Sequence, residues 1–148
     1  MQEQFKEYEF NYPSYNLLTK GVFAGAFTGI IISVANLGYD FIYRGITHFS
    51  PSEIINVSSL IFGSLLAMMF FAVIYLILAN ATKSAAIIFR ILMLIITVLV
   101  LAIIVTTNKD QSTFGGMHGL LIGLVAISGF VGGVLLIPYF AKNPQIYI

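Results

Sequence analysis

The chain has 148 residues and a formal net charge of +1, with 59% hydrophobic and only 9% charged residues. Soluble domains carry roughly 25% charged residues, so this composition and a mean hydropathy of +0.97 exclude an ordinary water-soluble domain. A nucleic-acid partner would call for a clustered basic face, and the sequence shows no such cluster. The lack of cysteine excludes disulfides, thiol catalysis, thiolate metal sites and palmitoylation.

The first 16 residues are polar and acidic, and they lack the basic start and short apolar core of a signal peptide. We therefore predict an interfacial tail rather than a cleaved segment, with docking on a partner as the alternative. Aromatic residues in this tail and at the ends of two apolar stretches are expected to anchor at the membrane interface. They are Tyr8, Phe10, Tyr12, Tyr15, Tyr39, Phe41, Tyr43, Tyr139 and Phe140.

Four apolar stretches are long enough to cross a bilayer, which takes about 20 helical residues. They cover residues 21–42, 54–78, 85–106 and 119–140. Short connections make neighbouring helices antiparallel. We therefore predict an all-α fold, an integral membrane four-helix bundle with up-down-up-down topology, as a single domain over residues 1–148.

The second stretch has the clearest start signal. In residues 50–53, Ser50 is a suitable N-cap, Pro51 fits the first helical position and Glu53 can complete a capping box. This pattern predicts that the helix begins at Pro51. The glycine-rich residues 112–119 lack the residues that end a P-loop, so we expect a flexible turn there.

The distribution of lysine and arginine predicts the orientation, because these residues are retained on the cytoplasmic side. Most of them fall in the N-terminal tail, the second connection and the C-terminal segment. Both termini are therefore expected in the cytoplasm, at a bacterial inner (plasma) membrane. The residues are Lys6, Lys20, Lys83, Arg90 and Lys142 on that side, against Arg44 and Lys109 on the other.

Small residues at helical spacing mark the faces expected to pack, because helices in lipid associate through close backbone approach and hydrogen bonds. The third span lacks such a face, so we expect spans one, two and four to form the core and span three to face lipid or another protein. Packing within the bundle is preferred over a dedicated dimer interface. The residues are Gly21, Gly25, Gly29 and Ser33; Ser59, Gly63 and Ala67; and Gly119, Gly123, Ala126 and Gly133.

Most side chains capable of chemistry gather at the end of the bundle opposite the termini, where we predict a candidate polar cavity. Asp40 precedes Arg44 by four residues, the favourable order for an intrahelical ion pair, and that structural interpretation is preferred over a ligand site. The candidate residues are Asn36, Asp40, Arg44, His48, Glu53, Asn56 and His118.

Asn36 lies about one turn deeper than Asp40, where a buried amide needs a partner, and Asn56 on the next span is the expected one. The histidines and Glu53 match no recognised metal-ligand spacing. No nucleophile motif is present either. We therefore expect no catalytic residue, no metal and no cofactor.

Three classes of function remain. The preferred one is a non-enzymatic structural or accessory subunit or assembly factor of a membrane complex, or a homo-oligomer. Its partners would be the lipid bilayer and other integral membrane proteins or further copies of the chain. The alternative is a small transporter or channel with an outward-facing cavity near Asp40 and Arg44. An enzyme acting on lipid or quinone has no motif to support it.

Overall fold

The computed structural model describes residues 16–50, 54–107 and 111–146, and this part of the chain is all-helical. Four of its helices are long and apolar enough to cross a membrane, so the chain is a multi-pass membrane protein. The first three are α1 (Leu17–Thr47), α2 (Val57–Ala81) and α3 (Ala85–Thr107). The fourth covers Gly116–Lys142.

The fourth helix changes its winding along its length. It consists of α4 (Gln111–Ala126), the π-helix η1 (Ile127–Leu136) and α5 (Ile137–Lys142), and a short 3₁₀ turn η2 (Pro144–Ile146) follows. The expected flexible turn over residues 112–119 is therefore wrong, because α4 already begins at Gln111.

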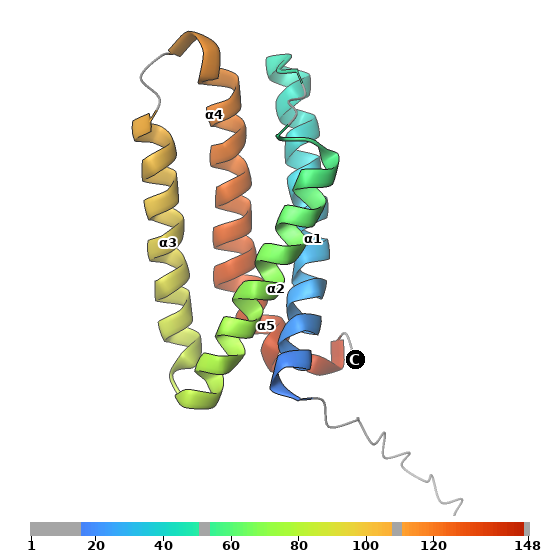
Figure 1. Cartoon of the computed structure of the whole chain (residues 1–148), viewed down its shortest axis with the longest axis vertical. Helices are drawn as coiled ribbons and strands as arrows, with labels where there is room; N and C mark the ends of the chain where they lie inside the picture. Colours follow the sequence, from blue (N-terminus) through green and yellow to red (C-terminus); the bar gives the residue numbers. More distant parts are fainter. Residues whose placement is uncertain (1–15, 51–53, 108–110, 147–148) are drawn as a thin grey trace, which may run out of the picture.

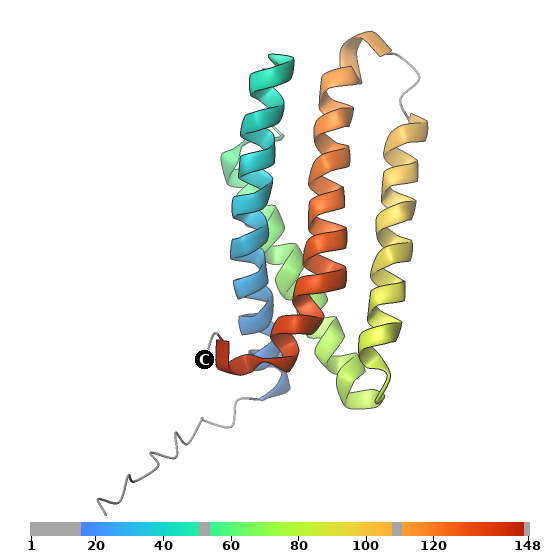
Figure 2. The same ribbon diagram turned by 180° about the vertical axis from the view of Figure 1, so that it is seen from behind.

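The four long helices stand side by side, with α3 at the edge of the bundle (Figures 1 and 2). The start of α1, the α2–α3 connection and α5 lie at one end, which we call the Lys83 end. The α1–α2 connection and the start of α4 lie at the other, which we call the His48 end. α2 and α3 meet at the Lys83 end and diverge toward the His48 end.

α1 and α2 form the closest helix pair, because glycines on α1 let the two backbones touch. A Cβ added to Gly29 would lie 2.8 Å from the Cα of Leu65, closer than real Cβ contacts come. In addition, the Ser33 hydroxyl donates a hydrogen bond to the Ile61 carbonyl at 3.3 Å. The contacts follow one another in the order Ser33 with Ile61, Gly29 with Leu65, Gly25 with Met69 and Gly21 with Val73.

The small face predicted on the second span does not make this contact. Ser59 and Gly63 are exposed, Ala67 is half-buried, and no atom lies within 4 Å of where a Gly63 Cβ would be. The glycines of α1 supply the clearance that the pair needs, so α2 can bring larger residues to the interface. The residues that α2 buries are Leu60, Ser64, Met68, Ala72, Tyr75 and Leu76.

The expected start of the second helix at Pro51 is also wrong, because α2 begins at Val57 with Asn56 as its N-cap. The Asn56 side chain accepts a hydrogen bond from the Ser59 backbone N–H at 3.0 Å. In return, the Ser59 hydroxyl accepts one from the Asn56 N–H at 3.0 Å. This reciprocal capping box satisfies two backbone donors and so fixes the later start. Residues 51–53 lie outside the described part of the chain.

The π-helix η1 was not predicted, and its glycines bring neighbouring side chains onto its backbone. π-helices are rare beyond a single turn. A Cβ on Gly129 would overlap the Thr97 side chain, and one on Gly133 would overlap Met93, both on α3. Gly132 faces Met68 in the same way. Pro138, which lacks a backbone N–H, lies where α winding resumes.

α3 packs against this π-helical segment through a single stripe of buried residues, and most of its other side chains are exposed. It buries the smallest share of the four spans. Its peripheral place agrees with the absence of a small-residue face, since it approaches the others through side chains rather than backbone. The buried stripe is Ala85, Phe89, Met93 and Thr97.

We expect Gly25→Ala to lower the free energy of unfolding by about 1–3 kcal/mol, because its Cβ would overlap the Met69 backbone, which cannot move alone. Gly38→Ala is the matched control, since nothing lies within 4 Å of that position on α1. Its higher helix propensity should leave stability unchanged or raise it by up to about 1 kcal/mol. Unfolding by SDS in mixed micelles measures both. Equal losses would contradict the backbone contact.

Candidate functional site

The polar side chains of α1 divide into two groups rather than one cavity. Asp40 and Arg44 lie near the His48 end of the helix, whereas Asn36 is buried deeper between three helices. Asp40 and Arg44 line an open recess of about 700 Å³, together with Leu37, Gly38 and Gly45. Asn36 does not line this recess.

Asp40 and Arg44 form an ion pair that also holds the α1–α2 connection. Arg44 Nε donates to Asp40 Oδ1 at 2.7 Å. The side chain of Arg44 is 14% exposed and that of Asp40 is 12% exposed. The guanidinium further donates to the Ile55 carbonyl at 3.0 Å and the Phe49 carbonyl at 3.4 Å. Its Cζ lies 5.3 Å from the centre of the Phe49 ring. The cation therefore ties the end of α1 to the residues that precede α2.

The other predicted cavity residues that the structure describes hold separate positions. α1 continues through Gly45 to Thr47, and His48 ends it in the left-handed conformation with φ 54° as an exposed C-cap. Asn56 caps α2, and His118 lies half-buried on α4. Glu53 lies outside the described residues. Within the described segments, no three His, Asp or Glu side chains come together as a metal site.

Two of the tyrosines expected as interface anchors dock α1 onto α4. Tyr39 donates its hydroxyl to the Gly119 carbonyl at 2.8 Å, and Tyr43 donates to the Gly116 carbonyl at 2.6 Å. A Cβ on Gly123 would overlap the Tyr39 ring. The α4 glycines thus accept aromatic rings rather than a helix backbone, which the glycine spacing did not distinguish. Ala126 and Gly133 lie further along this helix, half-buried and buried respectively.

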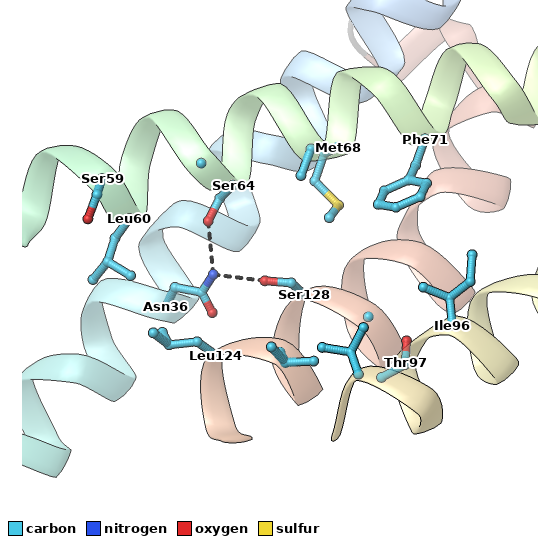
Figure 3. Close-up of a pocket in the computed structure, with 15 residues that line it drawn as sticks. Asn36, Ser59, Leu60, Ser64, Met68, Phe71, Ile96, Thr97, Leu124 and Ser128 are labelled. Atoms are coloured by element: carbon cyan, nitrogen blue, oxygen red, sulfur yellow. Dashed lines mark hydrogen bonds between the residues drawn. The ribbon is translucent and has the colours of Figure 1, made fainter. Parts of the chain in front are cut away.

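Asn36 connects three helices at the middle of the bundle. Its Nδ2 donates to Ser64 Oγ on α2 at 2.9 Å and to Ser128 Oγ on η1 at 3.0 Å, as Figure 3 shows. The prediction that Asn56 is the partner of Asn36 is wrong, because Asn56 caps α2. Ser64 and Ser128 were missed, although each is a hydroxyl in an otherwise apolar run.

The amide of Asn36 is only half satisfied. The side chain is 2% exposed, and its Oδ1 is buried with no hydrogen-bond partner among the described residues. An unmet buried acceptor costs about 1–3 kcal/mol. Such a group is uncommon in folded proteins and calls for an explanation.

A cavity of about 320 Å³ lies beside this amide, lined by residues of α2, α3 and the fourth helix (Figure 3). Ser59, Gly63 and Ala67, the small face predicted to pack, line it instead. Gly63 and Val100 are exposed members of the lining, so the cavity opens to the outside between α2 and α3. The rest of the wall is mainly apolar, with Leu60, Met68, Phe71, Ile96, Leu124 and Val125.

Comparison of the chain with protein-family models, with curated proteins and with solved structures gives no match. Any statement about function therefore rests on the residues and geometry of this chain.

We expect Asp40→Ala and Arg44→Ala each to lower the free energy of unfolding by about 1–3 kcal/mol, since each leaves a partly buried charge without its counter-charge. The double variant should lose less than the two single losses together, with a coupling energy of about 0.5–3 kcal/mol. A double-mutant cycle in mixed micelles measures it. Strictly additive losses would show that the two side chains do not act as a pair.

Proposed function

We propose that this multi-pass membrane protein is a non-enzymatic structural or accessory subunit or assembly factor that associates with other integral membrane proteins or with itself. The observation that carries the proposal is that the ion pair seen among the described residues is used within the fold. Arg44 binds Asp40 and two backbone carbonyls of the α1–α2 connection. This pair therefore supports a structural role better than a ligand-binding one.

The form of the bundle supports the same proposal. Little of the described chain lies outside the four spans, and α3 presents most of its apolar side chains outward. The transporter alternative needs a polar path past Asn36 toward the Lys83 end. The described core there is mainly apolar and includes Ile32, Met68, Met93 and Ile137, with Tyr75 as its member that carries a hydroxyl. The Thr28 hydroxyl is bonded to the Ala24 carbonyl of its own helix.

We propose an antiparallel up-down-up-down topology with both termini in the cytoplasm. Two observations support it: the order of contacts between α1 and α2, in which rising numbers on one helix meet falling numbers on the other, and the gathering of basic residues at the Lys83 end. The bacterial inner membrane expected from the sequence stays a prediction.

The orientation is testable because the chain has no cysteine of its own. We expect Ser50→Cys, at the exposed His48 end, to react with a membrane-impermeant maleimide in intact cells. Ser84→Cys and Gln145→Cys, both exposed at the Lys83 end, should react only after permeabilisation, and none of the three changes removes a lysine or arginine. The reversed pattern would refute cytoplasmic termini.

The accessory role is tested by native mass spectrometry of the full chain released from its own membrane. We expect a stable complex with a different integral membrane protein, or a defined homo-oligomer. Asp40→Ala/Arg44→Ala should keep that assembly if it folds, because the pair faces the chain's own connection. A monomer that moves a solute across vesicles would refute the proposal and favour transport.

A further inference from the structure

The cavity between α2, α3 and the fourth helix combines apolar walls with one incompletely bonded amide. Asn36 lines it, is almost fully buried, and has no donor for its Oδ1 among the described residues. Apolar pockets with a few placed polar groups are the usual form of small-molecule sites, and they occur between the helices of bundles.

The two serines cannot satisfy both ends of the amide. As it stands, Nδ2 donates to Ser64 and Ser128, and Oδ1 is unmet. Turning the amide by 180° would let both hydroxyls donate to Oδ1 but would leave Nδ2 without an acceptor. A hydroxyl group both donates and accepts, so it satisfies the unmet end in either orientation.

The volume of the cavity limits the size of a ligand that could carry this hydroxyl. At about 320 Å³, it is roughly twice an engineered apolar cavity of about 150 Å³ that binds benzene, so it suits about a dozen non-hydrogen atoms. A water molecule needs 2–4 polar partners, and the polar side chains of the lining that lie together are Asn36, Ser64 and Ser128. The walls formed by Met68, Phe71 and Leu124 favour an apolar body instead.

The depth of the cavity excludes a charged ligand. Thr97 and Ser128, both in its lining, stand near the middle of the third and fourth spans. Charge at the centre of a bilayer is costly, and the described lining contains no charged residue to compensate it. A phospholipid headgroup therefore does not fit, whereas an uncharged molecule with one hydroxyl does.

We propose that this cavity binds a lipophilic alcohol, which enters from the bilayer between α2 and α3 and hydrogen-bonds to Asn36. Gly63 marks the open side, since no atom lies within 4 Å of its Cβ position. Oδ1 itself has almost no exposed surface, so the hydroxyl reaches it only when a neighbouring group moves aside. This inference goes beyond the accessory role and does not depend on it.

The test compares two probes of equal size on the purified full chain in detergent micelles. 1-Undecanol and n-dodecane each have about a dozen non-hydrogen atoms, the size estimated from the cavity, and only the alcohol carries a hydroxyl. Apparent affinities come from the shift of the thermal unfolding midpoint across a titration, expressed as mole fraction in the micelle. We expect about fivefold tighter binding of the alcohol, the contribution of one neutral hydrogen bond.

Three variants locate the effect. Asn36→Leu removes the amide and should abolish the preference for the alcohol. Gly63→Leu fills the cavity from its open side and should abolish binding of both probes, while Gly38→Leu makes the same change at another open position of the bundle and should keep the preference. Where Asn36→Leu does not fold, the two glycine variants still decide the location.

Equal affinity of the wild-type chain for alcohol and alkane would overturn the proposal. A preference that survives in Gly63→Leu would overturn it as well, because the alcohol would then bind elsewhere. No stabilisation by the alcohol would overturn the proposal too, because it would show that the alcohol does not bind the folded chain. The mass of the assembly, measured separately, decides the accessory role whatever the result of this experiment.

Discussion

The close approach of the α1 and α2 backbones is the contact on which the rest of the bundle depends. Lipid tails are as apolar as leucine, so burial from lipid adds little to helix association, and van der Waals contact and hydrogen bonds must hold the pair. Gly21, Gly25 and Gly29 provide that contact because they remove the side chains that would separate the backbones. With α2 fixed on one side, α1 presents Tyr39 and Tyr43 to α4.

The two polar groups of α1 differ in how completely the fold satisfies them. Arg44 and Asp40 neutralise each other, and Nη1 and Nη2 of the guanidinium each donate to a backbone carbonyl. Asn36 holds α1, α2 and η1 together through Nδ2 but leaves Oδ1 unmet. The first group therefore fits a structural role, whereas the second leaves an unmet acceptor in the middle of the bundle.

The fourth helix and α3 together create the space beside that amide. The glycines of η1 let Thr97 and Met93 of α3 reach the helix backbone, so α3 is held close to the fourth helix rather than to α2. α2 follows α1 and diverges from α3 toward the His48 end (Figure 1). A cavity results where neither helix can fill the gap, and the small residues Ser59 and Gly63 keep it open.

The sequence by itself determined the four apolar helices, the Asp40–Arg44 pair and the glycine face of α1. Each of these depends on local composition or on spacing within one helix. Only the tertiary structure decided which residues meet that glycine face, that Asn36 bonds Ser64 and Ser128, and that α2 starts at Val57 with Asn56 as its N-cap. Helical spacing fixes which residues share a face but not the rotation or tilt of the neighbouring helix, so a small face such as Ser59 and Gly63 can equally pack or line a cavity. The π winding of η1 was not predicted either, and the side chains of other helices that meet its glycines are likewise known only from the tertiary structure.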